Sequence, residues 1–138
     1  MKTDLTYLRA KLQAALTLAA CWLTRFLGGA DILLKTLLVF MAADIATGLI
    51  AAFHEKKLSS AIGFKGISKK ALILLLVGLA HMMDESIGGG ALRGAVLGFY
   101  ISNEGLSVLE NAARLGLPVP QKLKGALIQL HGKEDGDG

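Results

Sequence analysis

Four apolar blocks divide the chain, and each has the length of a helix that crosses a membrane. They cover Leu5–Leu27, Ile32–Phe53, Ile67–Ile87 and Ala91–Leu109. A transmembrane helix needs about 20 mostly apolar residues to cross a hydrocarbon core of about 30 Å. Each block also carries charge at an end or a polar group inside. The pattern therefore predicts an all-α, polytopic membrane helix bundle with three to four transmembrane helices, rather than isolated anchors.

The first block has two stripes at helical spacing. Apolar residues recur from Leu5 to Phe26, and Arg9, Gln13, Thr17 and Thr24 follow a second stripe with the same period. Such an amphipathic helix either lies in the membrane interface or spans with its polar stripe facing other helices. We expect residues 1–30 to form this helix. The spanning version is favoured and puts both termini in the cytoplasm, whereas the surface-lying version leaves three spans and puts the N-terminus outside.

The start of this block also resembles a secretory signal. Basic residues precede the apolar run Leu12–Ala20, and Cys21 follows it as the cysteine of a lipoprotein cleavage box does. The apolar pattern continues past Cys21 to Leu27, where a lipoprotein usually has a flexible polar tether. The favoured interpretation is therefore an uncleaved helix. Because Cys21 is the single cysteine, an internal disulfide is excluded.

Composition supports a membrane bundle over a soluble one. Hydrophobic residues make up 53% of the chain and charged residues 19%, and the mean hydropathy is +0.53. Soluble domains average about 45–50% apolar and about 25% charged residues. The alternative, a soluble four-helix bundle, needs a broad charged face on each helix. The segment Ala71–Met83 has no such face.

The charge pattern predicts an orientation in the membrane. The net charge is +4, and the largest group of basic residues is the set of lysines between residues 56 and 70. Residues 54–70 form a predicted loop that carries an excess of lysines, and an excess of this kind marks the cytoplasmic side. The lysines expected to contact lipid headgroups there are Lys56, Lys57, Lys65, Lys69 and Lys70. The turn at Asp84 and Glu85 is acidic and fits the outer side.

These assignments divide the rest of the chain into two parts. Residues 31–114 form the predicted transmembrane core, with spans at about 32–53, 67–87 and 91–111. Residues 115–138 form a cytoplasmic C-terminal segment, in which Gln121–Leu130 has the pattern of a short amphipathic helix and residues 131–138 the polar, glycine-rich composition of a disordered tail. The basic residues are not interleaved with aromatic residues, so no nucleic-acid partner is expected.

Two acidic residues lie inside apolar blocks at similar predicted depth. They are Asp44 and Glu104. An unpaired acid at the centre of a membrane helix costs about 2.5–3.5 kcal/mol on insertion scales. Protonation, or pairing with His81, Lys35 or Arg93, would neutralise them, and the sequence does not select among these. The cost favours pairing between helices or between subunits.

No pattern in the sequence indicates catalysis. The chain has no nucleophile elbow, no phosphate-binding loop and no HExxH motif. His81 lacks the neighbouring cysteine, histidine or carboxylate spacing of a zinc site. We therefore expect no enzymatic activity, no cofactor and no bound metal.

Three stretches, in this order and spacing, resemble the toxin-secretion and phage-lysis holins, which include the clostridial toxin-release holins. They are Gly28–Ala52, Lys56–Asp84 and Tyr100–Pro120. The resemblance implies a small multi-pass protein of the bacterial cytoplasmic membrane, encoded by a phage or prophage. It implies that copies oligomerise with one another in the lipid bilayer and form pores or lesions. An endolysin, or in some relatives a toxin, crosses through them, and host cell lysis follows.

Polar residues in the predicted spans are the candidates for pore-lining or oligomer contacts. They are Asp44, Thr47, His81, Arg93, Tyr100, Asn103, Glu104, Ser107, Glu110 and Asn111. In the last block several of them recur at helical spacing. Such a stripe either turns towards water when a lesion opens or packs permanently between helices. The alternative function is a small ion channel or transporter subunit that uses Asp44, His81 and Glu104.

Overall fold

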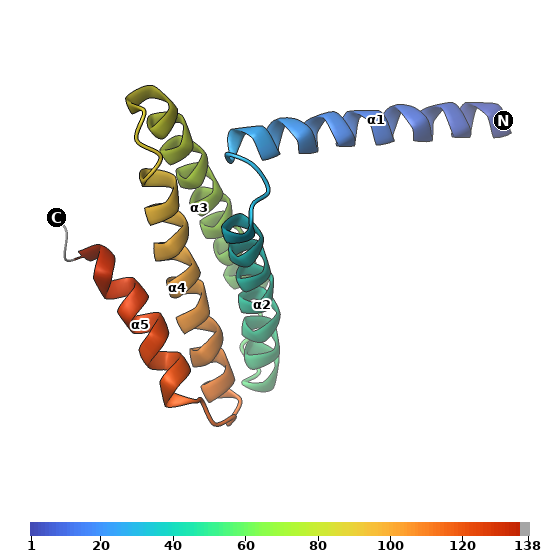
Figure 1. Ribbon diagram of the computed structural model, residues 1–138. Helices are drawn as coiled ribbons and strands as arrows, with labels where there is room; N and C mark the ends of the chain where they lie inside the picture. Colours follow the sequence, from blue (N-terminus) through green and yellow to red (C-terminus); the bar gives the residue numbers. More distant parts are fainter. Residues whose placement is uncertain (136–138) are drawn as a thin grey trace.

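The computed structural model describes residues 1–135, and the side chains of residue 1 and residues 4–130. That part of the chain forms five α-helices and no strand, which confirms the all-α prediction (Figure 1). The helices are α1 (Lys2–Phe26), α2 (Ile32–His54), α3 (Ser60–Ile87), α4 (Leu92–Arg114) and α5 (Gln121–Asp135). Residues 131–135 were predicted to be disordered but continue α5, and the rest of that predicted tail lies outside the described residues.

Local side chains fix where the central helices begin. The carboxylate of Asp31 accepts a hydrogen bond from the backbone N–H of Leu34 at 3.0 Å, and the hydroxyl of Ser59 accepts one from that of Ile62 at 3.3 Å. Both are N-caps, which satisfy donors that a helix start leaves free. Because Ser59 starts α3, most of the predicted loop at residues 54–70 is helical. The connection between α2 and α3 covers only residues 55–59.

Helices α2, α3 and α4 form a three-helix bundle in which α4 packs along both partners (Figure 1). The core is apolar, and Leu37, Val77 and Leu97 are completely buried in it. Helix α5 folds back along α4 after the Pro118–Pro120 turn. It is seated at Gly105, where an added Cβ would lie 3.0 Å from the methyl groups of Leu127. The absence of a side chain at Gly105 therefore makes room for α5.

Helix α1 does not join this bundle. Figure 1 shows it running crosswise to α2 and pointing away from the other helices. All side chains from residue 4 to residue 23 are exposed, and contact with the bundle begins only at the last turn. The predicted first helix is therefore present, but the arrangement in which it packs as a fourth member of the bundle is wrong.

The outer faces of the bundle are apolar. Leu72 on α3 is 60% exposed and Val39 on α2 is 64% exposed, although both are large hydrophobic residues. Exposed apolar surface of this extent marks a site of contact with a partner or a membrane. Within the described residues, one helix, α2, is long and apolar enough to count as a candidate membrane span. The predicted number of three to four spans is thus not confirmed.

Candidate functional site

A buried lysine joins the three central helices. Lys70 is 8% exposed, and its Nζ donates to the carboxylate of Asp44 on α2 at 2.6 Å and to the carboxylate of Glu104 on α4. Lys70 follows the buried face of α3 because it lies three and seven residues before Ile73 and Val77. It was predicted to contact lipid headgroups, and this helical phase places it inside the bundle instead. Lys56, Lys57, Lys65 and Lys69 are exposed.

The carboxylate of Asp44 is held by further donors from α4. The hydroxyl of Ser107 donates to its Oδ1 at 2.6 Å, and the amide of Asn111 donates to the same oxygen at 3.1 Å. The Asn111 amide also donates to the hydroxyl of Thr47, again at 3.1 Å. Five of the ten predicted candidates, Asp44, Thr47, Glu104, Ser107 and Asn111, therefore form one network with Lys70. We call these six residues the polar network.

The polar network continues to the end of the bundle where α2 stops. Arg114 donates to the side-chain oxygen of Asn111 at 3.2 Å and binds both oxygens of Glu55 at 2.8 and 3.0 Å. The hydrogen bond from Arg114 holds the pKa of Glu55 below its usual value. This two-pronged pair ties the last turn of α4 to the residue that follows α2.

The polar network is satisfied but carries an unbalanced charge. With all three groups ionised, Asp44 and Glu104 bring two negative charges against the single positive charge of Lys70. Glu104 is only 2% exposed. Among the described residues, no buried side-chain nitrogen or oxygen lacks a hydrogen-bond partner. The desolvation cost of a buried ion pair can exceed the attraction between its charges. The polar network is therefore weak evidence for a stabilising role, and its presence suggests a functional one.

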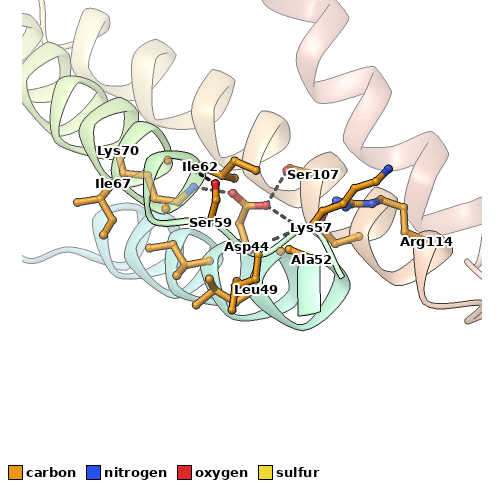
Figure 2. Close-up of a pocket in the computed structure, with 16 residues that line it drawn as sticks. Asp44, Leu49, Ala52, Lys57, Ser59, Ile62, Ile67, Lys70, Ser107 and Arg114 are labelled. Atoms are coloured by element: carbon orange, nitrogen blue, oxygen red, sulfur yellow. Dashed lines mark hydrogen bonds and ion pairs between the residues drawn. The ribbon is translucent and has the colours of Figure 1, made fainter. Parts of the chain in front are cut away.

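A pocket of about 330 Å³ leads from the surface to the polar network. Figure 2 shows Asp44, Lys70 and Ser107 on its wall, with the apolar side chains of Leu49 and Ile62 nearby. Gly48, Gly63 and Gly66 also line it. The absence of side chains at these glycines leaves a groove between α2 and α3, the two helices of the bundle that contact each other least.

Arg93 belongs to a second cluster, at the opposite end of the bundle. Arg93 is 9% exposed, and its guanidinium donates to the carbonyls of Leu27 and Gly29 at 2.6 and 3.0 Å, and to the carboxylate of Asp31 at 2.5 Å. The hydrogen bond from Arg93 lowers the pKa of Asp31. Arg93 therefore fixes the connection between α1 and α2.

The remaining candidates do not join the polar network. His81 lies 3.6 Å from Glu85, and it follows Lys70 by eleven residues, about 16 Å along the helix axis. Tyr100 packs against the apolar core and makes an edge-to-face contact with Phe99. The last two, Asn103 and Glu110, line a second pocket of about 260 Å³, whose wall also includes Asp44, Lys70, Glu104 and Ser107 of the polar network. The described residues contain no group of three or more His, Cys, Asp and Glu that could hold a metal ion.

These features define a small helical protein whose apolar side chains face outward and whose charged groups meet inside. The chain belongs to the bacteriophage holin family, whose model matches residues 21–132. An uncharacterised 14.9 kDa protein of Clostridium perfringens is 48% identical over 113 residues, which cover 80% of this chain and 86% of that protein. A probable holin of Bacillus phage phi105 is 36% identical over 103 residues, 74% of this chain and 76% of that protein. No solved structure matches.

Membership in this family suggests a role at the cytoplasmic membrane and implies a non-enzymatic function. It also gives the apolar outer faces of α2 and α3 a natural environment, since lipid would cover them. The first twenty residues, most of α1, lie outside the family match.

Proposed function

We propose that this chain is a holin that accumulates in the cytoplasmic membrane of the host cell and then assembles with further copies into lesions. An endolysin crosses through these lesions and host lysis follows. A toxin is the other candidate cargo, because the sequence also resembles toxin-release holins. Family membership and the similarity to the probable holin of a Bacillus phage support this proposal.

In this proposal α2, α3 and α4 span the membrane, so residues 31–114 form the multi-pass core. The end of the bundle that holds residues 55–59 faces the cytoplasm, because exposed lysines gather there and basic residues favour the cytoplasmic side. Lys56, Lys57 and Lys65 are then close to the lipid headgroups, and the long side chain of Lys69, which precedes Lys70, extends towards them. Residues 115–120 lie on the same side, and α5 returns from there along α4, with Leu127 beside Gly105.

The polar network is the observation that carries the proposal. Its charges meet where an unpaired acid in lipid costs about 2.5–3.5 kcal/mol, so the closed bundle has to keep them paired. A bundle held by apolar contacts alone has no polar surface to offer to water. When α2 and α3 separate at the groove between them, Asp44, Lys70 and Glu104 become a hydrated lining. The same residues are therefore paired with one another in the closed bundle and contact water in the open lesion.

No observation favours the alternative, an ion channel that uses Asp44, His81 and Glu104. His81 is about 16 Å along α3 from the point where the two acids meet. The positive charge of Lys70 also sits between the two acids and opposes a cation at that place.

Release of a folded enzyme from the cytoplasm tests the function. The chain is expressed in bacteria that contain a soluble reporter enzyme and lack an endolysin. Reporter activity in the medium and the membrane potential are then followed together. We expect reporter activity to appear in the medium at the moment when the potential collapses. Collapse of the potential while the reporter stays inside would overturn the large lesion and support a small, ion-conducting pore.

A further inference from the structure

The direction in which α1 leaves the bundle is fixed by a packed elbow, residues 27–31. Arg93 holds it through the carbonyls of Leu27 and Gly29 and through the carboxylate of Asp31. Gly28 and Gly29 have φ values of 84° and 99°, in the left-handed region that favours glycine. A Cβ added at Gly28 would overlap the side chain of Arg93. Arg93 can therefore occupy its place at the turn only because position 28 has no side chain.

An aromatic side chain anchors the last turn of α1. The ring of Phe26 rests directly on Gly78 of α3, where a Cβ would overlap it. Trp22 stacks on Phe26, with 5.7 Å between the ring centroids. Together with the elbow, these contacts leave α1 little freedom to swing alongside the bundle.

The crosswise direction of α1 has a consequence for the membrane. Helix α2 is the candidate span, and α1 leaves its N-terminal end crosswise (Figure 1). A helix that runs crosswise to a spanning helix, at the end of that helix, lies in the plane of the membrane surface. The surface concerned is the outer one, because the exposed lysines of the α2–α3 connection lie at the other end of α2.

The side chains of α1 suit that position. Leu5, Leu8, Leu12, Leu16 and Leu23 share one face, and each is between 44% and 64% exposed. Gln13, Thr17, Cys21 and Thr24 follow one another on a second, polar face at helical spacing. Arg9, Lys11 and Arg25 give the helix a positive charge, which anionic lipid headgroups attract.

We propose that α1 is an interfacial helix that lies on the outer leaflet of a bilayer containing anionic lipids, with its leucine face in the lipid and the N-terminus outside. The proposal rests on the proposed function, in which α2 to α4 span. It replaces the predicted cytoplasmic N-terminus and leaves three spans.

The native cysteine is a reporter for this arrangement. Cys21 is exposed and lies on the polar face of α1. Intact cells that express the protein are treated with a membrane-impermeant maleimide before lysis begins, and labelling is read as a mass shift. We expect Cys21 to react without permeabilisation. In a Cys21→Ser background, Asp4→Cys should also react from outside, whereas the matched variant Leu16→Cys, on the leucine face, should react only after denaturation.

Each other outcome would overturn the proposal. If α1 spans, Cys21 lies seven residues, about 10 Å, below the surface and stays unlabelled, and Asp4→Cys reacts only after permeabilisation. If a second copy covers the leucine face, Leu16→Cys forms disulfide-linked dimers. A Lys124→Cys variant in the same background separates these results from failure of the proposed function. It should react only after permeabilisation, and labelling of Lys124→Cys from outside would refute the proposed topology itself.

Discussion

Replacing Lys70 by methionine removes the cation that two buried carboxylates share. Asp44 keeps its hydrogen bonds from Ser107 and Asn111, whereas Glu104 loses the pairing with Lys70 while staying 2% exposed. Breaking a buried ion pair by removing one partner costs about 3–5 kcal/mol. We therefore expect Lys70→Met to lower the free energy of unfolding by this amount, most of it through Glu104.

The measurement uses protein purified in a mild detergent and unfolded by titration with a denaturing detergent, followed by the helical circular dichroism signal. The control is Lys69→Met, which removes the same charge from the next, exposed position and should change the free energy of unfolding by less than about 0.5 kcal/mol. A second change, Glu104→Met, should restore most of the stability that Lys70→Met removes. Equal stabilities of Lys70→Met and Lys69→Met would refute the claim that the lysine neutralises a buried acid.

Two further predictions concern the contact between α4 and α5 and the ion pair at the end of α2. Gly105→Val should push Leu127 away from α4 at a cost of about 1–3 kcal/mol, seen as faster proteolysis within α5, and unchanged proteolysis would argue against the seating of α5 there. The pKa of Glu55 is lowered in the folded state by Arg114, so the pair should stabilise the fold above the usual pKa of 4.5 and lose this effect as the pH falls through the lower folded value. The unfolding midpoint of Glu55→Gln should thus be lower than that of the wild type at neutral pH and meet it in acid, and a constant gap would contradict this linkage.

The helical elements follow from the sequence because apolar residues recur at helical spacing, but the start of α3 at Ser60 was missed, since it lies within the predicted loop at residues 54–70. The acids at Asp44 and Glu104 stand out as charges inside apolar blocks. Lys70 does not stand out, because it ends a lysine-rich segment that has the composition of a cytoplasmic loop. Its spacing from Ile73 and Val77 is the signal that identifies it as buried.

The contacts that hold the elbow between α1 and α2 could not be predicted from the pattern of apolar and polar residues. Arg93 contacts residues that precede it by more than sixty positions, and two of its three partners are backbone carbonyls, which leave no trace in a side-chain pattern. Gly78 is likewise visible in the sequence, but its pairing with the ring of Phe26 depends on how α1 meets α3. The direction of α1 therefore comes from tertiary contacts and not from its own amphipathic pattern.

The central claim is that the polar network exists for opening rather than for stability. The triple variant Asp44→Asn, Lys70→Met and Glu104→Met removes its charges, while the new side-chain amide at position 44 still offers an oxygen to Ser107 and Asn111 in place of the carboxylate. Replacing a buried ionic group by apolar residues is often neutral or stabilising by about 1–4 kcal/mol, so this variant should accumulate in the membrane as well as the wild type. The most direct measurement is the time at which it releases the cytoplasmic reporter enzyme at equal membrane levels. We predict late release or none, and release on the wild-type schedule would contradict the claim.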